Sequence, residues 1–318
     1  MSLYDHYQFF KQAWFSGKPI WQTSDMPDLS GKVIIVTGGG AGIGKGTVQA
    51  LLEHNAKVYI ATRNQASAEA AIKELKALTG KDAHFIHLDL EDLPSVRKAA
   101  EEFLKQETRL DVLFNNAGVM MPPVEKTTPA GYDLSFGVNV LGHFFFTKLL
   151  LPIMMQTSKT TGIPSRIVTT SSGAHYLAKY DFNAFKDGPA RKKMNLIDLY
   201  GQSKWGNIVF ANEVARRYGD KGIVSCSVNP GNLHRTETNL ARHVQGGIEF
   251  YLLKMMQIYP LAWGILPQLY AGTSPDGADF NGKFVVPWGW LAPARSDTTD
   301  PQIGKELWTW LEEQVKDI

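Results

Sequence analysis

The chain has 318 residues, of which 44% are apolar and 20% charged, a composition typical of a globular protein with room for one large α/β domain. The formal net charge of +2 is too small to predict a nucleic-acid partner. The single cysteine, Cys226, excludes an intramolecular disulfide and a multi-cysteine metal site, and it favours a cytoplasmic location. No stretch approaches the roughly 20 apolar residues of a membrane-spanning helix.

The first 28 residues are expected to form an N-terminal arm. Residues 1–21 carry seven aromatic side chains but lack the basic, apolar and small-residue regions of a signal peptide. We expect the arm to pack on the body of the protein. A peripheral contact of these aromatic side chains with a membrane is the alternative.

An apolar β-branched run, Lys32–Val36, leads into Thr37-Gly-Gly-Gly-Ala-Gly-Ile-Gly44, and a helical pattern follows. Glycines permit positive φ and let a phosphate approach the amides at a helix N-terminus. A P-loop is disfavoured because Gly46 stands where Ser or Thr would bind magnesium, and G-x-G-x-x-G fails because Lys45 replaces its last glycine. The sequence fits T-G-x-x-x-G-x-G instead.

Beyond this turn, predicted strands and helices alternate. The strands are expected at 57–61, 84–88, 111–114, 166–170 and 223–228, and the helices at 66–78, 94–106, 131–155 and 199–218. This alternation predicts a Rossmann-type α/β fold, a doubly wound parallel sheet with helices on both faces, in a single domain of residues 29–318. Ligands of such sheets collect at the carboxyl ends of the strands.

Polar and small residues follow three of these strands. They form the motifs Asn115-Asn-Ala-Gly118, Thr169-Thr-Ser-Ser-Gly173 and Asn229-Pro-Gly231. Tyr200 and Lys204 are four positions apart and so share one face of a helix. A nearby ammonium and a positive nicotinamide would lower the tyrosine pKa from its usual value of about 10.

Taken in this order, the motifs resemble the short-chain dehydrogenase/reductase family from about Leu29 to Trp288. The aromatic lead-in, the insertion between Ser172 and Tyr200 and the ending Gly282-Lys-Phe-Val-Val-Pro-Trp288 resemble its retinol-dehydrogenase-like and WW-domain-oxidoreductase-like branch, without a WW domain.

The resemblance implies a catalytic group of four residues. Tyr200 would act as acid and base, and Ser172 would hydrogen-bond the reacting oxygen, with Ser171 as the alternative. Lys204 would bind the nicotinamide ribose and lower the Tyr200 pKa. Asn139 would hold a water of the proton relay, although a buried mid-helix asparagine is often satisfied by its own backbone.

The expected cofactor is NADP(H). The second strand is followed by Thr62-Arg63-Asn64, without the acidic residue that would bind a ribose 2′-hydroxyl, and Arg63 would pair with a 2′-phosphate. Lys45 is a second candidate cation, and Arg63 is otherwise a solvated surface residue. The residues implied to bind the cofactor are Thr37, Gly38, Gly40, Gly42, Ile43, Gly44, Arg63, Asn64, Asp89, Leu90, Asn116, Ala117, Gly118, Tyr200, Lys204, Pro230, Gly231, Asn232 and Thr236.

Two of these assignments have alternatives. Asp89 is equally placed to be a helix N-cap. Thr238 competes with Thr236 as the threonine that bonds the nicotinamide carboxamide.

The substrate side is expected to be closed by residues 175–197 and by a helical lid at about 232–275. The lid is rich in apolar and aromatic residues, which implies a hydrophobic aldehyde, ketone or alcohol as substrate. Ordinary core packing is the alternative for these residues. No acidic substrate is expected.

We therefore expect an NADP(H)-dependent oxidoreductase that interconverts a hydrophobic carbonyl compound and its alcohol. The alternatives are an NADP(H)-binding regulatory protein without turnover and a P-loop hydrolase. No metal is expected, since no H-E-x-x-H or Cys/His cluster occurs. The family often pairs subunits through the helices that carry Asn139 and Tyr200, so the resemblance implies a homodimer.

Overall fold

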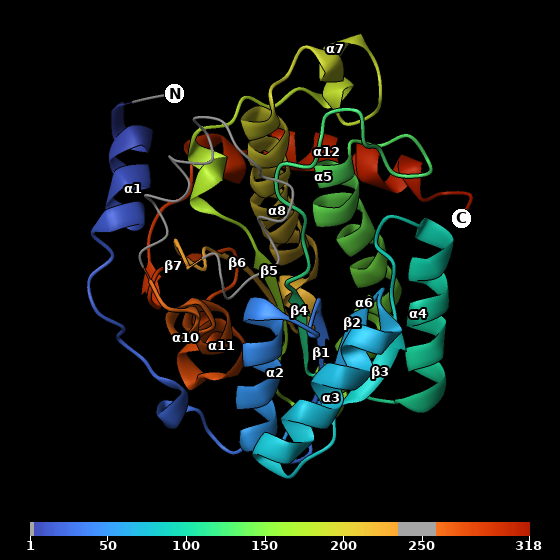
Figure 1. Cartoon of the computed structure of the whole chain (residues 1–318), viewed down its shortest axis with the longest axis vertical. Helices are drawn as coiled ribbons and strands as arrows, with labels where there is room; N and C mark the ends of the chain where they lie inside the picture. The colour runs from blue at the N-terminus through green and yellow to red at the C-terminus, as the bar shows by residue number, and fades with distance from the viewer. Residues whose placement is uncertain (1–2, 235–258) are drawn as a thin grey trace.

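A computed structural model describes residues 3–234 and 259–318, and its centre is an eight-stranded sheet with the order β3-β2-β1-β4-β5-β6-β7-β8 (Figure 1). Neighbouring strands run parallel except for the antiparallel pair β7 and β8. The predicted doubly wound sheet is confirmed, and β7 and β8 are added to it. The strands are β1 (Val33–Thr37), β2 (Lys57–Thr62), β3 (His84–His87), β4 (Val112–Asn115), β5 (Ser165–Thr170), β6 (Ile223–Val228), β7 (Phe284–Val286) and β8 (Trp290–Leu291).

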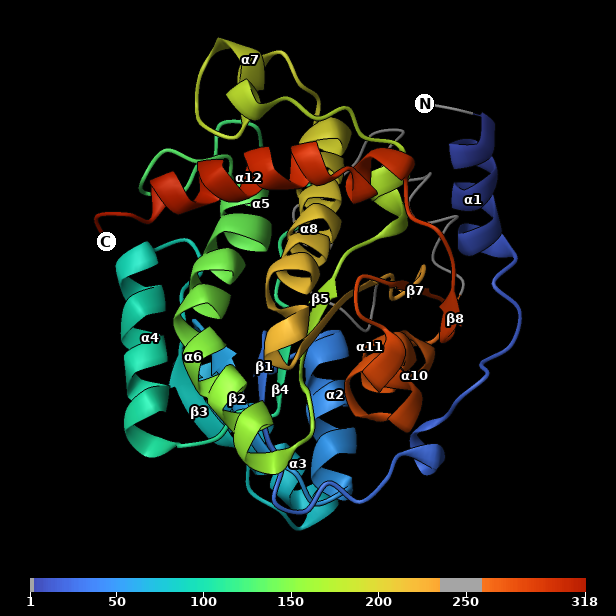
Figure 2. The ribbon, with the colours of Figure 1, turned by 180° about the vertical axis from the view of Figure 1, so that it is seen from behind.

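Helices cover both faces of this sheet (Figures 1 and 2). One face carries α2 (Gly42–Glu53), α3 (Gln65–Thr79), α10 (Leu261–Gly264) and α11 (Leu266–Thr273). The other carries α4 (Leu93–Gln106), α5 (Leu134–Phe136), α6 (His143–Thr161), α8 (Leu196–Tyr218) and, outside α8, α12 (Pro301–Gln314). At the periphery lie α1 (Leu3–Trp14) and α7 (Pro189–Lys192).

Successive residues of β1 enter two different cores. Val33 and Ile35 pack with α4, α6 and α8, whereas Ile34 and Val36 pack with α2 and α11. A parallel strand covered on both faces buries every side chain, which explains the unbroken β-branched run.

The helix expected at 131–155 begins later and is irregular. A π-helical segment, Gly137–Gly142, joins α5 to α6 and contains Asn139. The backbone N–H of His143 bonds Val140 instead of Asn139. The carbonyl of Asn139 is satisfied by side chains, with His143 Nδ1 at 3.0 Å and Asn207 Nδ2 at 2.6 Å. Such π turns are frequent at functional sites.

Residues 134–161 also correct an expectation about membrane spans. This helix has the length and apolar composition of a spanning segment, contrary to the expectation that no stretch would, but most of it is buried inside the protein. It packs against α4, α8 and the sheet, as the core helix of an α/β fold does.

Only part of the expected lid falls within the described residues. Thr236, Thr238 and most of the lid aromatics lie outside them, within 235–258. The described remainder includes α11, which lies in the core against the sheet with Leu269 fully buried. Its Gln268 donates to Thr47 and accepts from Thr170. Residues 266–273 are therefore core and not lid.

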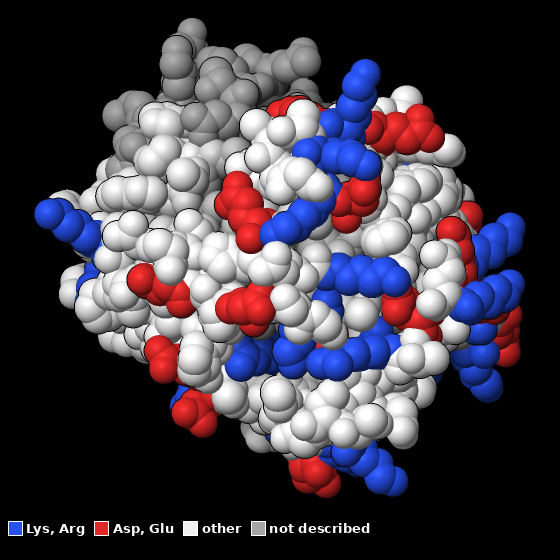
Figure 3. Space-filling model, turned by 90° about the horizontal axis from the view of Figure 1, so that it is seen from below, with Lys and Arg blue, Asp and Glu red and all other residues white. Residues whose placement is uncertain are grey.

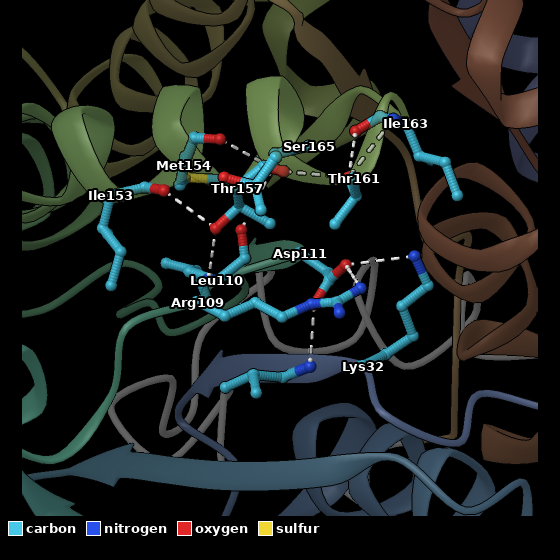
Figure 4. A network of polar contacts seen from close by, with 12 residues as sticks. Lys32, Arg109, Leu110, Asp111, Ile153, Met154, Thr157, Thr161, Ile163 and Ser165 are labelled. Atoms are coloured by element: carbon cyan, nitrogen blue, oxygen red, sulfur yellow. Dashed lines mark hydrogen bonds and ion pairs between the residues drawn. The ribbon is translucent and has the colours of Figure 1, made fainter.

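An ion cluster around the buried Asp111 connects the amino ends of the central strands (Figure 4). Asp111, just before β4, accepts hydrogen bonds from Lys32 at 3.0 Å, from Arg109 at 2.6 Å and from the backbone N–H of Val33 at 3.0 Å. Burial alone would raise the pKa of Asp111, but these three donors outweigh it and hold the pKa below its usual value. The cluster lies at the amino ends of the strands, opposite the carboxyl ends where ligands of such sheets bind.

Helix α12 covers the outer face of α8. Its Trp308 ring lies 5.1 Å from Phe144 of α6 and 4.7 Å from the guanidinium of Arg217. All residues of α8 from Leu199 to Ala215 are buried. Helix α12 thus covers the outer face of α8, one of the two helices through which the resemblance implied subunit pairing.

We expect the protein to be monomeric, because a partner could reach α8 only by displacing α12. Light scattering coupled to size exclusion should give the mass of one chain, 35.3 kDa. A stable species of twice that mass would contradict the prediction.

Candidate active site

The turn between β1 and α2 excludes side chains by close packing. A Cβ at Gly44 would lie 2.3 Å from the carbonyl oxygen of Gly38, and one at Gly38, where φ is +68°, would lie 3.0 Å from Cα of Ala117. By contrast, a Cβ at Gly40 would meet nothing closer than 3.8 Å. Among the described residues no side chain caps the N-terminus of α2, which leaves its first amides for a ligand. This cradle suits the pyrophosphate of a dinucleotide.

The hydroxyl of Thr37 joins the cofactor turn to the next strand and to α6. Its Oγ1 accepts the backbone N–H groups of Asn116 and Ala117, both at 2.9 Å, and lies 2.9 Å from Nε2 of His143. Because the carbonyl of Asn139 can only accept, His143 Nδ1 carries the proton and Nε2 accepts from Thr37. Burial lowers the pKa of His143 to about 4, which keeps this neutral tautomer at pH 7. The Thr37 side chain is therefore a positioning group.

The N-N-A-G segment brings the glycine turn and the catalytic helix together. Asn116 Nδ2 donates to the Thr37 carbonyl at 2.8 Å. A Cβ at Gly118 would lie 3.1 Å from Asn139 Oδ1 and 3.7 Å from Lys204 Nζ. Gly118 is therefore the point where residues from three elements meet.

The side-chain amide of Asn139 hydrogen-bonds groups inside the protein, mainly backbone. Its Oδ1 accepts from the Val119 N–H at 2.9 Å, and its Nδ2 donates to the Val119 carbonyl at 3.0 Å and to Ser203 Oγ at 2.9 Å. Both amide protons are thus used, so the side chain positions the segment after β4 beside Lys204.

The two serines after β5 have different surroundings. Ser171 is buried and donates to the carbonyl of Lys204 at 2.7 Å, so it anchors α8 to the sheet. Ser172 is half-buried, lies close enough to the side chain of Tyr200 to lower its pKa, and accepts from the backbone N–H of Ala174 at 3.2 Å. Ser172 is therefore the serine that adjoins the tyrosine, and its catalytic role stays a prediction.

Tyr200 and Lys204 lie one turn apart on α8, with Lys204 Nζ 5.9 Å from the tyrosine ring centre. Burial raises the pKa of Tyr200 to about 12, although the Ser172 hydrogen bond lowers it. Burial also lowers the pKa of Lys204 to about 7, and its Nζ donates to the Thr170 carbonyl at 2.9 Å. In the polypeptide by itself desolvation decides both pKa values, and the fall in the tyrosine pKa expected beside a positive nicotinamide stays a prediction.

The turn after β6 is tightly packed. Gly231 has φ of +82°, and a Cβ there would lie 2.5 Å from the buried Trp288 ring. Its N–H donates to Asn229 Oδ1 at 3.1 Å, and Asn232 Nδ2 donates to the Ala13 carbonyl at 3.3 Å. Pro230 is the residue between Asn229 and Gly231, which the first of these bonds joins. Thr236 lies outside the described residues.

Arg63 extends from the end of β2 over the end of β3. Its exposed guanidinium pairs with Glu91 and lies 3.8 Å from Asp89. The neighbouring Asn64 caps α3 through the Ser67 N–H at 2.9 Å, and Lys45 pairs with Glu74 at 2.7 Å. The N-cap of the following helix, α4, is Asp92 and not Asp89.

Two further residues of the predicted cofactor set face the protein. Leu90 is buried, and Ile43 packs against the core that contains α2. In the part of the chain that the structure describes, no three His, Cys, Asp or Glu side chains gather where they could hold a metal.

The chain is similar to known proteins over most of its length. A family profile described as short chain dehydrogenase matches residues 32–185. A short-chain dehydrogenase/reductase of Armillaria gallica is 52% identical over 95% of this chain and 96% of its own length. The chain belongs to the short-chain dehydrogenase/reductase family. Human retinol dehydrogenase 11 is 41% identical over 68% of this chain and 64% of its own length, a partial similarity.

Solved structures are similar to this chain in fold. An uncharacterized protein from Mycobacterium paratuberculosis is 27% identical, with a TM-score of 0.71 over 93% of this chain and 97% of its own. The Pseudomonas aeruginosa RhlG/NADP active-site complex is 23% identical, with a TM-score of 0.63 over 81% of this chain and 94% of its own. The second likeness shows the shared fold alone.

Sequence reasoning missed His143, Asn207 and Ser203, which hold Asn139 and Thr37 in place. His143 is four positions after Asn139, and Asn207 and Ser203 lie on one face of the Tyr200 helix. These spacings were visible, but any core helix can show them, so only the tertiary contacts reveal their role in a short-chain dehydrogenase/reductase.

We expect acid to destabilise the protein through His143. Its pKa of about 4 in the fold lies below the unfolded value of 6.5, so the unfolded state takes up the proton first. Stability that is fully present above pH 6.5 should be lost as the pH falls toward 4, approaching roughly 1.4 kcal/mol per pH unit. Denaturant unfolding at pH 7, 6, 5 and 4.5 measures this slope.

His143→Gln should flatten the slope by about that amount, because glutamine does not titrate. His175→Gln is the matched comparison. It should flatten the slope as well, since burial also lowers the pKa of His175, to about 3. An unchanged slope in a folded His143→Gln protein would contradict the neutral tautomer.

Proposed function

We propose that the protein is an NADP(H)-dependent oxidoreductase that interconverts a hydrophobic aldehyde or ketone and its alcohol. Membership of the short-chain dehydrogenase/reductase family supports oxidoreductase activity with a nicotinamide cofactor. The observation that carries the proposal is the adjacency of Ser172 and Tyr200, which lie beside Lys204 at the carboxyl end of β5.

In the reducing direction, a bound NADPH supplies the hydride to the carbonyl carbon. Tyr200 donates its phenolic proton to the carbonyl oxygen as negative charge develops there. Ser172 donates a hydrogen bond to the same oxygen and stabilises that charge in the transition state. The buried ammonium of Lys204 stabilises the phenolate that Tyr200 leaves behind until a proton returns. The oxidising direction runs through the same residues in reverse.

The preference for NADP(H) rests on Arg63. Arg63 follows β2 directly, and no acidic residue stands at this position in the sequence. Its guanidinium is paired with Glu91, so a 2′-phosphate would exchange one anionic partner for another. Glu91 therefore weakens the preference without abolishing it.

The apolar surroundings of Tyr200 support a hydrophobic substrate. Met120 and Met121, directly after the N-N-A-G motif, are buried in one cluster with Tyr200, and Leu196 packs against it. Methionine side chains fit ligands of varied shape, which suits an aliphatic or aromatic carbonyl compound.

Loss of the acid should strongly lower the rate of turnover. We expect Tyr200→Phe to lower the rate about 10²- to 10⁴-fold, because the phenolic proton is removed while the ring still fills the site. The assay is loss of reduced-nicotinamide absorbance over a panel of aromatic, aliphatic and isoprenoid carbonyl compounds. Tyr218→Phe, on the same helix but far from Ser172, is the control and should keep its activity.

The same assay tests the alternative function. A protein that binds NADPH but turns over no carbonyl in the panel, and is unaffected by Tyr200→Phe, would favour an NADP(H)-binding regulatory protein without turnover.

Cofactor choice is tested separately at Arg63. We expect Arg63→Ala to weaken NADPH binding about 10- to 100-fold and NADH binding hardly at all, because only NADPH carries the 2′-phosphate. Glu91→Gln should tighten NADPH binding by freeing the guanidinium. Titration of cofactor fluorescence measures both, and tighter binding of NADH than NADPH by the unchanged protein would overturn the assignment.

A peripheral membrane contact through α1 is also proposed, in a cytoplasmic protein. Leu3, Tyr7 and Phe10 expose 91%, 58% and 53% of their surface, Lys11 is exposed on the same helix, and Lys18 is exposed in the segment that follows it. Cys226 is a free buried thiol, in keeping with a reducing compartment. On the face shown in Figure 3 acidic and basic side chains are interspersed, which does not favour a nucleic-acid partner.

The membrane contact through α1 is tested by co-sedimentation with anionic vesicles. We expect co-sedimentation to be lost when Tyr7→Ser and Phe10→Ser are combined.

A further inference from the structure

The N-terminal helix α1 is amphipathic, but its polar face is buried and its apolar face is mostly exposed. Its buried side chains include Asp5, Gln8 and Gln12, whereas its large apolar side chains are mostly exposed. Figures 1 and 2 show α1 at the edge of the molecule, separate from the helical layers that cover the sheet. Polar side chains are buried at a cost unless they find partners, so the partners of this face show why the helix is placed there.

Those partners are the loops that follow β5 and β6. Gln12 accepts from Asn229 Nδ2 at 3.0 Å and donates to the Tyr176 hydroxyl, also at 3.0 Å. Asn229 in turn receives the N–H of Gly231 through its Oδ1. Gln12 is thus a positioning residue that connects the N-P-G turn to η3 (Gly173–Tyr176), the turn that starts directly after Ser172.

The carboxyl end of α1 is fastened to both sides of the segment 235–258. Asn232 donates to the Ala13 carbonyl at 3.3 Å, and the Tyr259 hydroxyl donates to the Trp14 carbonyl at 3.2 Å. These bonds satisfy carbonyls that a helix end otherwise leaves unpaired. Helix α1 therefore has a defined position relative to the catalytic loops.

On this helix, Phe9 faces the catalytic serine loop. A Cβ at Gly173 would lie 3.6 Å from Cδ2 of Phe9 and also 3.6 Å from Asn229 Nδ2. Gly173 follows Ser172, so the ring lies one residue away from the serine beside Tyr200. Because Gly173 has no side chain, the ring lies where a Cβ at Gly173 would make an ordinary van der Waals contact with it.

We propose that Phe9 and Gly173 form one wall of the substrate pocket and that this wall selects the apolar substituent next to the reacting carbonyl. This inference rests on the proposed function, because it assigns the substrate specificity of the same site. The ring offers a flat apolar surface, and Gly173 adds no side chain that would narrow the space beside Ser172. The N-terminal helix is then part of the catalytic unit, although it lies far from the family motifs in the sequence.

The test compares Phe9→Ala with Phe10→Ala, its exposed neighbour on the same helix. Phe9→Ala should raise KM about tenfold for the small aromatic carbonyls of the panel, because a wall of their pocket is lost, and should lower it for bulkier ones. Affinity for NADPH should stay unchanged. Phe10→Ala should preserve the order of substrate preference.

Gly173→Ala provides the reverse change at an ordinary contact distance, 3.6 Å from the Phe9 ring. It should raise KM most for the bulkiest substrates, and Phe9→Ala in the same chain should partly restore them. Additive effects of the two substitutions, or an equal change in Phe10→Ala, would overturn the shared wall.

A second readout separates this inference from the proposed function. The rise in Tm that each carbonyl compound causes in the NADPH-saturated protein needs no turnover. If nothing turns over but Phe9→Ala alters the order of these shifts, the proposed reaction fails and the wall stands. If turnover occurs and Phe9→Ala changes neither KM nor the shifts, the wall fails and the reaction stands.

Discussion

The buried hydroxyl of Thr37 is the contact on which the site depends. It receives two amides from the segment after β4 and connects to α6 through the neutral imidazole of His143. A buried oxygen with these partners cannot shift without leaving a polar group unpaired, which costs more than a single hydrogen bond contributes. The two central strands and the π-helical segment around Asn139 are thereby held in one arrangement.

Burial sets the protonation of the catalytic groups in opposite directions. Desolvation raises the pKa of Tyr200 to about 12 and lowers that of Lys204 to about 7. The tyrosine is therefore held as a phenol that has a proton to donate. The lysine is close to half-charged near neutrality, which suits the part in proton return that the proposed function gives it. An arrangement on the surface would leave both groups near their usual pKa values.

Segments distant in sequence complete the site and close the fold. Helix α1 supports the loops after β5 and β6 through Gln12, and α12 shields α8, which carries Tyr200 and Lys204. Both helices lie outside the repeating strand–helix pattern. They make the site depend on parts of the chain that carry none of the family motifs.

The sequence by itself determined what is local. Strands, helices and the glycine turn follow from apolar periodicity and from backbone freedom, and Tyr200 and Lys204 share a helix face because of their spacing. The family resemblance placed Ser172 ahead of Ser171. Only the tertiary structure decided which side chain each buried polar group meets: Asn139 holds backbone, α11 lies in the core, and Gln12 supports the catalytic loops. Periodicity reports which side of a helix is buried, but the partner across a contact between distant segments has no local signature.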